Sequence, residues 1–348
     1  MMTRKRIYIQ DATQISIQKP LCEEWMESPI RYDVQYARSV DPDYREFFSP
    51  LEGRRMGKIL KRALAASLRV VRNTGVTQPD AIISGTGLGC IENTEIFLTA
   101  MCEEGESLLK PTSFMQSTHN TISSLLSINL KCHGYNVTYA HKGISFDSTV
   151  YDAWLQLRLG KIDNALVGGH DEITPSYFTL LQRIGYVGGD MKGVCGEASV
   201  AAMINTRSEN NLCELCGVTM LYRPTAERMN AALERMLAEE GIARDDLDAV
   251  ITGVNGNAAN DAFYDAAAES LFASIPTVRY KDIFGECYSA SGFALYAGAH
   301  CLHKGFIPEF MYYGKTAPKG SRPKNILLFN HFEGKTCSMI LLRSVCGR

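Results

Sequence analysis

The sequence lacks the signatures of several broad classes of protein. Of its 348 residues, 36 are basic and 38 acidic, and the formal net charge of -2 leaves no excess of one sign to attract nucleic acid or a membrane surface. No uncharged apolar run approaches the roughly 18 residues that a membrane span needs. The opening MMTRKRIYIQ is not followed by an apolar stretch with a cleavage site. We therefore expect a cytoplasmic protein that binds neither nucleic acid nor membrane.

A metal or cofactor motif is also missing. The eleven cysteines stand at irregular spacings, mostly inside apolar segments, as is typical of reduced thiols packed in a core. The one Cys-x-x-Cys, Cys213 to Cys216, has no second pair and lies in a strand-like run. We predict no metal site and no cofactor.

Strand-like segments rich in β-branched residues alternate with helical patterns along the chain, which predicts an α/β fold. The strand-like DAIISG from Asp80 and DAVITG from Asp248 each follow an amphipathic helix, and they lie 168 residues apart. GKIDNALVGG from Gly160 and GFIPEFMYYG from Gly305 form a second pair, each closing a helix and opening an apolar strand. Matched order at an offset of about half the chain predicts two duplicated halves.

The boundary between these halves should lie near residues 205–225, after the strand-like ASVAAMINT and around the polar RSENN. No proline- or serine-rich linker occurs there, so we expect the halves to share one core. The predicted units are residues 1–210 and 211–348.

Four segments resemble motifs of one enzyme family. KPTSFMQSTHN from Lys110 resembles the segment that precedes the nucleophile of ketosynthases, and YNVTYAHKGISF with the later NALVGG resembles their nucleophile strand, helix and Gly-Gly strand. KDIFGE from Lys281 resembles their Lys-Ser-Met-Thr-Gly-His motif, and ILLFNHFEGKT resembles their carboxyl-terminal Asn-Ser-Phe-Gly-Phe-Gly-Gly-Thr-Asn segment. In order and spacing the chain is thus similar to the thiolase-fold β-ketoacyl synthases. The resemblance implies a thiolase-like fold with two α/β halves in five layers, α-β-α-β-α.

The nucleophile of this family is missing. A ketosynthase carries its acyl chain on a cysteine thiolate at a helix amino terminus, and counting back from the Gly-Gly strand places that cysteine at Gly143. Glycine has no side chain to acylate. Ser145 is the nearest hydroxyl, and it would need a strong base such as His141 to replace a thiolate.

The two histidines that polarise the malonyl thioester are missing as well. The first aligns with Gly253, although a small shift places it at Asn255 or Asn257, and the second aligns with Glu286. A carboxylate would oppose an enolate unless it were protonated. The family lysine persists as Lys281, and an internal Lys281–Glu286 ion pair is the simplest expectation because a buried carboxylate needs a partner.

Loss of all three catalytic residues implies a non-catalytic, chain-length-factor-type subunit in acyl-carrier-protein-dependent fatty acid or polyketide biosynthesis. Such a subunit shapes the acyl tunnel of an active ketosynthase partner in a pseudo-symmetric heterodimer. HKGISF from His141 resembles a form found in ketosynthase-like proteins of aryl-polyene and flexirubin clusters, which implies a polyene product. The resemblance places tunnel and interface residues at Phe114, Met115, Ser117, His119, Ile122, His141, Ser145 and Asn257.

Two other functions remain open at this point. The chain could be an active 3-oxoacyl synthase or acyltransferase with a site rebuilt from Ser145, His141 or Glu286. It could also be a ligand-binding homodimer with no role in synthesis. For the proposed tunnel residues the plainer alternative is that Phe114 and Met115 pack in the core and that His119 is a hydrogen-bonded interface residue.

Overall fold

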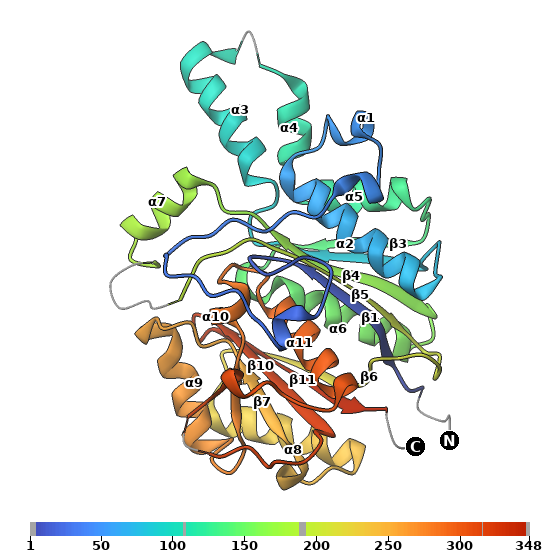
Figure 1. The fold of residues 1–348 in the computed structure, drawn as a ribbon, viewed down its shortest axis with the longest axis vertical. Coiled ribbons are helices and arrows are strands. Elements are labelled where there is room, and N and C mark those ends of the chain that lie inside the picture. Colours follow the sequence, from blue (N-terminus) through green and yellow to red (C-terminus); the bar gives the residue numbers. More distant parts are fainter. Residues whose placement is uncertain (1–4, 107–108, 188–192, 315, 346–348) are drawn as a thin grey trace.

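A single mixed sheet runs through the computed structural model, which describes residues 5–106, 109–187, 193–314 and 316–345 (Figure 1). Within these ranges eleven strands follow the order β3-β2-β4-β5-β1-β6-β11-β10-β7-β8-β9. The strands of the first half are β1 (Tyr8–Ile15), β2 (Ala81–Gly85), β3 (Tyr135–Tyr139), β4 (Asn164–Asp171) and β5 (Ala198–Asn205). Those of the second half are β6 (Cys213–Tyr222), β7 (Ala249–Thr252), β8 (Thr277–Arg279), β9 (Tyr312–Tyr313), β10 (Asn325–Phe332) and β11 (Thr336–Ser344).

The two halves repeat one topology. The order β3-β2-β4-β5-β1 matches β8-β7-β10-β11-β6, and in both sets the first three strands are parallel while the last two join by antiparallel pairs. The segments DAIISG and DAVITG form β2 and β7, which occupy equivalent places. The predicted duplicated α/β fold is therefore confirmed.

The second predicted sequence pair is correct for the helices and wrong for the strands. Helices α6 (Ser145–Arg158) and α11 (Ser291–Lys304) each end before a left-handed glycine, Gly160 with φ 67° and Gly305 with φ 82°. The counterpart of β4 is β10, however, and the segment after Gly305 forms only the two-residue β9, antiparallel to β8. Residues 306–324 are an insertion between the repeated helix and strand, and a local match of letters could not reveal it.

The connection between β5 and β6 spans residues 206–212, and the predicted boundary at 210/211 falls inside it. Strand β1 pairs with β5 along its length and with β6 at Tyr8 and Ile9, so the sheets of the two halves join edge to edge. This pairing makes one continuous sheet of the two halves.

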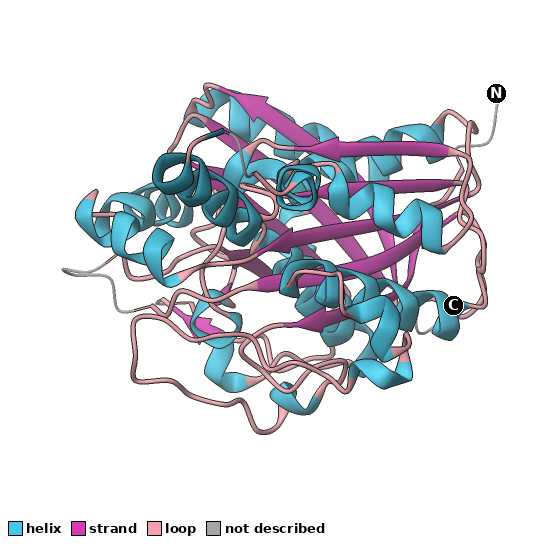
Figure 2. Ribbon diagram, turned by 90° about the horizontal axis from the view of Figure 1, so that it is seen from above, coloured by secondary structure: helices cyan, strands magenta, loops and turns pink. Residues whose placement is uncertain are grey.

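Helices cover both faces of each half-sheet, which gives the five predicted layers (Figure 2). Helices α2 (Lys58–Thr74) and α5 (Thr121–Asn129) pack on the outer face of the first half, and α8 (Ala226–Glu240) and α9 (Ala258–Ser270) on that of the second. Helices α6 and α11 lie between the halves. The remaining α-helices are α1 (Pro50–Gly53), α3 (Ile91–Glu104), α4 (Pro111–Ser117), α7 (Pro175–Arg183) and α10 (Lys281–Phe284).

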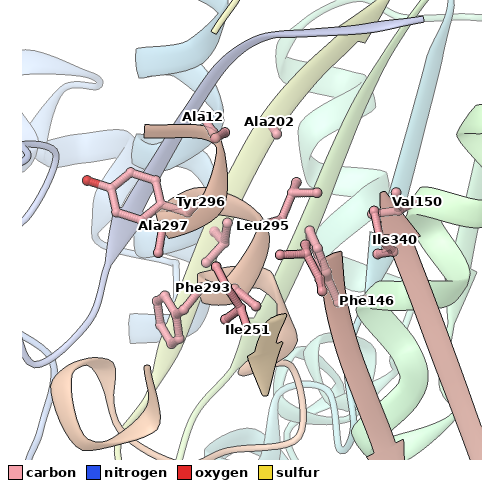
Figure 3. Packing of buried hydrophobic residues seen from close by; sticks show 14 of the residues in the cluster. Ala12, Phe146, Val150, Ala202, Ile251, Phe293, Leu295, Tyr296, Ala297 and Ile340 are labelled. Atoms are coloured by element: carbon pink, nitrogen blue, oxygen red, sulfur yellow. The ribbon is translucent and has the colours of Figure 1, made fainter. Parts of the chain in front are cut away.

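Strand alternation sends side chains to both cores. Ala81 and Ile83 of β2 face the middle layer, whereas Ile82 between them faces the outer helices. Figure 3 shows the middle core, where Phe146 of α6 and Phe293 of α11 pack with residues of the sheet. Every residue of α11 from Ser291 to Leu302 is buried, as expected of a helix covered on all sides.

The Cys-x-x-Cys of β6 does not form one site, because Cys213 faces the middle core and Cys216 faces the outer one. Glu214, Cys216 and Glu240 place ligand-type atoms within 4.8 Å of one another. A guanidinium nitrogen of Arg343 lies 3.1 Å from Glu214 and 2.8 Å from Glu240, so an ion-pair cluster fills this position. Among the described helices, none is long and apolar enough to cross a membrane.

Candidate active-site cleft

A cleft with a volume of ≈ 480 Å³ opens between the two halves, where parallel strands of both end. It brings together five of the positions selected from the sequence, namely Gly143, Asn255, Asn257, Lys281 and Glu286. The sequence-based selection missed most of its other lining residues, among them Tyr186, Asn260, Tyr288, Ser291, Asn330, His331 and Phe332.

Gly143 lies in a 3₁₀ turn, η4 (Lys142–Ile144), directly before α6. This is the place where a helix dipole would favour a thiolate. A Cβ atom at Gly143 would lie 2.5 Å from Cδ2 of Phe332, well inside van der Waals contact. The ring of Phe332 therefore occupies the space that a nucleophilic side chain at this position would need.

A buried hydrogen-bond network fixes the Gly143 turn. The Asn330 amide donates to the carbonyl oxygen of Gly143 and to Asp147, each at 3.0 Å. Asp147, in the first turn of α6, also accepts from the hydroxyls of Ser291 at 2.7 Å and Ser338 at 2.5 Å. Burial raises the pKa of Asp147, while these hydrogen bonds oppose the shift. Because the network links α6, α11 and both strands of the β10–β11 hairpin, it holds the floor of the cleft in one arrangement.

The expected internal ion pair is present. Lys281 Nζ lies 2.7 Å from Oε2 of Glu286, and the Asn255 amide donates to the same oxygen at 2.6 Å. Glu286 is 3% exposed and Lys281 7%. The carboxylate accepts both of these bonds, so it presents negative charge and no hydrogen-bond donor to the cleft.

Of the three candidates for the first histidine, Asn255 is the residue that reaches Glu286. Gly253 lies outside the lining of the cleft, and a Cβ there would clash with the Tyr264 hydroxyl. Asn257 lines the cleft and caps α9, since its side chain accepts from the backbone N–H of Ala259 at 3.0 Å. The cleft therefore holds the side-chain amide of Asn255 hydrogen-bonded to the carboxylate of Glu286.

One histidine does line the cleft, and its ring is fully engaged. His331 Nε2 lies 3.0 Å from the carbonyl oxygen of Asn260, and Nδ1 accepts from the backbone N–H of Gly334 at 3.1 Å. Burial lowers the pKa of His331 to about 4, against the opposing effect of the Asn260 carbonyl. A neutral ring with both nitrogens bonded has no free group for proton transfer. The signal for it was the NHFEG sequence of the carboxyl-terminal motif.

Ser145 and His141 do not form a nucleophile–base pair. The Ser145 hydroxyl lies 2.9 Å from the carbonyl oxygen of Thr86 and 2.7 Å from that of Lys142, and it accepts from the backbone N–H of His141. Ser145 is fully buried outside the cleft lining. The His141 ring instead lies 3.2 Å from the Ser148 hydroxyl.

The predicted tunnel residues of segment 111–123 lie away from the cleft. Phe114 and Met115 of α4 are 56% and 69% exposed, and His119 is also exposed. The Ser117 hydroxyl donates to the Phe114 carbonyl oxygen at 2.7 Å. Ile122 of α5 is buried in the core beneath α2. The surface positions suit contact with another chain, and only Ile122 packs as a core residue.

Comparison with known proteins shows one family throughout. The family model described as beta-ketoacyl synthase, N-terminal domain, matches residues 23–240. The 3-oxoacyl-[acyl-carrier-protein] synthase 2 of Mycobacterium leprae is 24% identical over 277 residues, which are 70% of this chain and 65% of that protein. The Mycobacterium tuberculosis enzyme of the same name is 23% identical over 281 residues, 71% and 66% of the two lengths. The chain thus spans slightly less than two thirds of these relatives.

Solved structures share the fold. The ishigamide ketosynthase/chain length factor superposes with a TM-score of 0.83 at 18% identity, covering 98% of this chain and 100% of that one. A beta-ketoacyl synthase from Burkholderia phymatum STM815 gives a TM-score of 0.79 at 14% identity, with 98% and 100% covered. A type II polyketide synthase acyl carrier protein in complex with its ketosynthase gives 0.79 at 13%, with 99% and 100% covered.

Proposed function

Because this chain belongs to the beta-ketoacyl synthase family, we propose that it is a non-catalytic subunit of chain-length-factor type. It would pair with an active ketosynthase and shape the acyl tunnel of that partner, in biosynthesis that uses an acyl carrier protein. The HKGISF segment favours a conjugated, aryl-polyene-like product.

The observation that carries the proposal is the pairing of Gly143 with Phe332. Acyl transfer in this family needs a side chain at the amino terminus of α6, and here the position has none and its space is filled. Two other side chains that line the cleft fit the same conclusion. Glu286 is committed to Lys281 and Asn255, and His331 is committed to backbone groups. Cys287 also lines the cleft, but burial raises the pKa of its thiol well above the ordinary value. A thioester in this cleft would therefore meet neither a thiolate nor a free histidine donor.

One face of the chain suits a similar partner. Strand β3 is the edge of the sheet, so its outer backbone groups are available for pairing. Next to it, α6 exposes Tyr151 and Leu155, and Leu159 directly after the helix continues the spacing of four residues, so the three form one apolar stripe. An edge strand beside an apolar helical stripe is suited to two-fold association with a chain of the same fold. Phe114 and Met115 would then be free to contact the partner near its tunnel.

A second surface suits an acidic carrier protein. Arg54, Arg55, Lys58 and Lys61 lie within eight positions around the start of α2, and within the described residues none of them forms an ion pair with a carboxylate. Gly57 at the amino terminus of α2 supplies no side-chain cap, so the helix dipole adds to the positive potential. We propose these four side chains as the contact for an acyl carrier protein.

The test of the function is assembly and activity with defined components. The purified chain alone should neither take an acyl group from acyl carrier protein nor elongate it with malonyl groups. It should co-purify with a cysteine-containing ketosynthase from its own cell, and the pair should make longer chains than that ketosynthase alone. Elongation by the chain alone would refute the proposal. A stable homodimer that ignores every ketosynthase of the cell would favour a ligand-binding role instead.

The alternative is an active synthase with a rebuilt site. The mycobacterial relatives favour this alternative by their name, 3-oxoacyl-[acyl-carrier-protein] synthase 2. Intact-protein mass spectrometry after incubation with acyl donors distinguishes the two. An adduct that disappears in Ser145→Ala and persists in the matched control Ser148→Ala would support the enzyme. The buried, doubly engaged hydroxyl of Ser145 predicts no adduct in any variant.

A further inference from the structure

Helices α3 and α4 form an arm, defined as residues 91–104 and 111–117, that stands away from the sheet (Figure 1). No residue of α3 is buried, and Ile96 and Leu98 expose 53% and 47% of their surface. Helix α3 packs mainly against α4, where the rings of Phe97 and Phe114 lie 5.3 Å apart. So little apolar burial leaves the position of the arm dependent on its few polar contacts with the body.

Two carboxylates join α3 to the body, and Gln116 of α4 adds a hydrogen bond to the carbonyl oxygen of Arg55 at 2.7 Å. Glu172, directly after β4, accepts from the backbone N–H of Glu92 in the first turn of α3 at 3.0 Å. Cys90, at the N-cap position, makes no side-chain capping bond, so Glu172 serves as the cap from another element. Glu95 of the arm accepts from the Thr174 hydroxyl at 2.5 Å. Glu172 is only 4% exposed, unlike Glu95 at the partly exposed side of the joint.

The surroundings of Glu172 disfavour its ionised form. Among the described residues, the titratable and charged groups that act on it are Glu92 on the arm, Glu197 of the segment before β5, the Cys90 thiol before α3 and the cation Arg62 of α2. Arg62 is shared, since its guanidinium lies 2.8 Å from Glu197 and 2.6 Å from Asp41. Burial is the largest cause that raises the pKa of Glu172, which reaches about 7. The hydrogen bond from Glu92 opposes this shift, and the acidic neighbours add to it.

We propose that Glu172 is a proton-controlled latch, which holds the arm against the body when it is protonated and releases it when it ionises. The carbonyl oxygen of a protonated Glu172 still accepts from Glu92, so protonation removes the charge without removing the cap. An ionised Glu172 gains hydration if α3 moves away. The latch is inferred from the contacts of this joint alone. Any effect of arm release on a partner chain through Phe114 rests on the proposed function.

The pH window follows from linkage. With the arm docked the pKa of Glu172 is about 7, and release of the arm removes part of its burial and the charge of Glu92, which lowers the pKa toward the ordinary value of 4.5. Docking therefore takes up a proton. Docking is strongest at low pH, weakens by at most about tenfold per pH unit as the pH rises to 7, and is constant above, for a total change of at most about 300-fold.

Hydrogen exchange tests the latch. Exchange of residues 91–104 is followed by mass spectrometry from pH 5 to 8, corrected for the intrinsic pH dependence of amide exchange, with buried α2 as reference. The wild-type arm should open more readily as the pH rises to 7 and then level off. The isosteric Glu172→Gln variant should show no such dependence, and Glu95→Gln, which removes the other carboxylate of the joint, should keep it. The proposal would be overturned if opening of the wild-type arm did not change with pH, or if opening in Glu172→Gln changed with pH as it does in the wild type. If Glu172→Gln does not fold, the wild-type profile alone decides.

Discussion

The tight contact between Gly143 and Phe332 gives the sharpest prediction. In Gly143→Ala the new Cβ would lie 2.5 Å from Cδ2, 3.2 Å from Cγ and 3.4 Å from Cβ of Phe332. Carbon atoms pack at about 3.5–4.0 Å, so the ring must move by about 1 Å. It cannot do this by turning its far end alone, because the base of the side chain is also close and Tyr288 packs against the ring at 6.0 Å between centroids. We expect a loss of about 1–3 kcal/mol of unfolding free energy.

Backbone strain does not contribute to this cost, because the φ angle of Gly143 lies outside the left-handed region. The matched control is therefore Phe332→Ala, and the double variant isolates the contact. Urea unfolding of the four proteins should give a coupling of about 1–2 kcal/mol, with Gly143→Ala nearly harmless once the ring is gone. A Gly143→Ala protein as stable as the wild type would show that Phe332 does not fill this space, and the central argument against a nucleophile here would fail.

Two further predictions concern the other cleft residues. Lys281→Ala should destabilise the protein by about 3–5 kcal/mol, because it leaves Glu286 buried without its cation. In thermal unfolding, the double variant with Glu286→Gln should recover much of that loss. A double variant that shows no recovery would contradict the ion pair. The pKa of His331 is about 4 in the folded chain and 6.5 for the free group. The stability that the neutral ring contributes is therefore fully present above pH 6.5. It falls by about 1.4 kcal/mol per pH unit as the pH drops toward 4. Urea midpoints between pH 4 and 8 should show a shallower fall in His331→Gln than in the wild type, and an unchanged slope would mean that the ring is not held neutral.

The duplication could be predicted because the strands that repeat are buried and carry the same apolar letters. DAIISG and DAVITG form central strands, where side chains on both faces must pack and few sequences fit. The edge of the second half was predicted wrongly, because the two-residue β9 is an edge element whose sequence is under no such double constraint. Residues 306–324 lie between α11 and β10, so the strand that truly matches β4 does not directly follow the matching helix in the sequence.

The site was only partly visible in the sequence, because its residues come from five separate segments. Gly143, Lys281 and Glu286 could be placed by counting within local motifs, and the structure brings them into one cleft. The engagement of His331 with Asn260 and Gly334 could not be predicted, because it depends on where β10 ends relative to α9.

The sequence by itself determined which residues stand at the positions where a catalytic cysteine and histidine were expected, namely Gly143 and Glu286, since the identity of a residue needs no geometry to establish. Only the tertiary structure decided what fills those places. Phe332 reaches Gly143 across 189 positions of sequence, and Asn255 reaches Glu286 across 31. Such contacts arise from the packing of two halves against each other, and side-chain packing is set by three-dimensional neighbours that local sequence patterns do not encode.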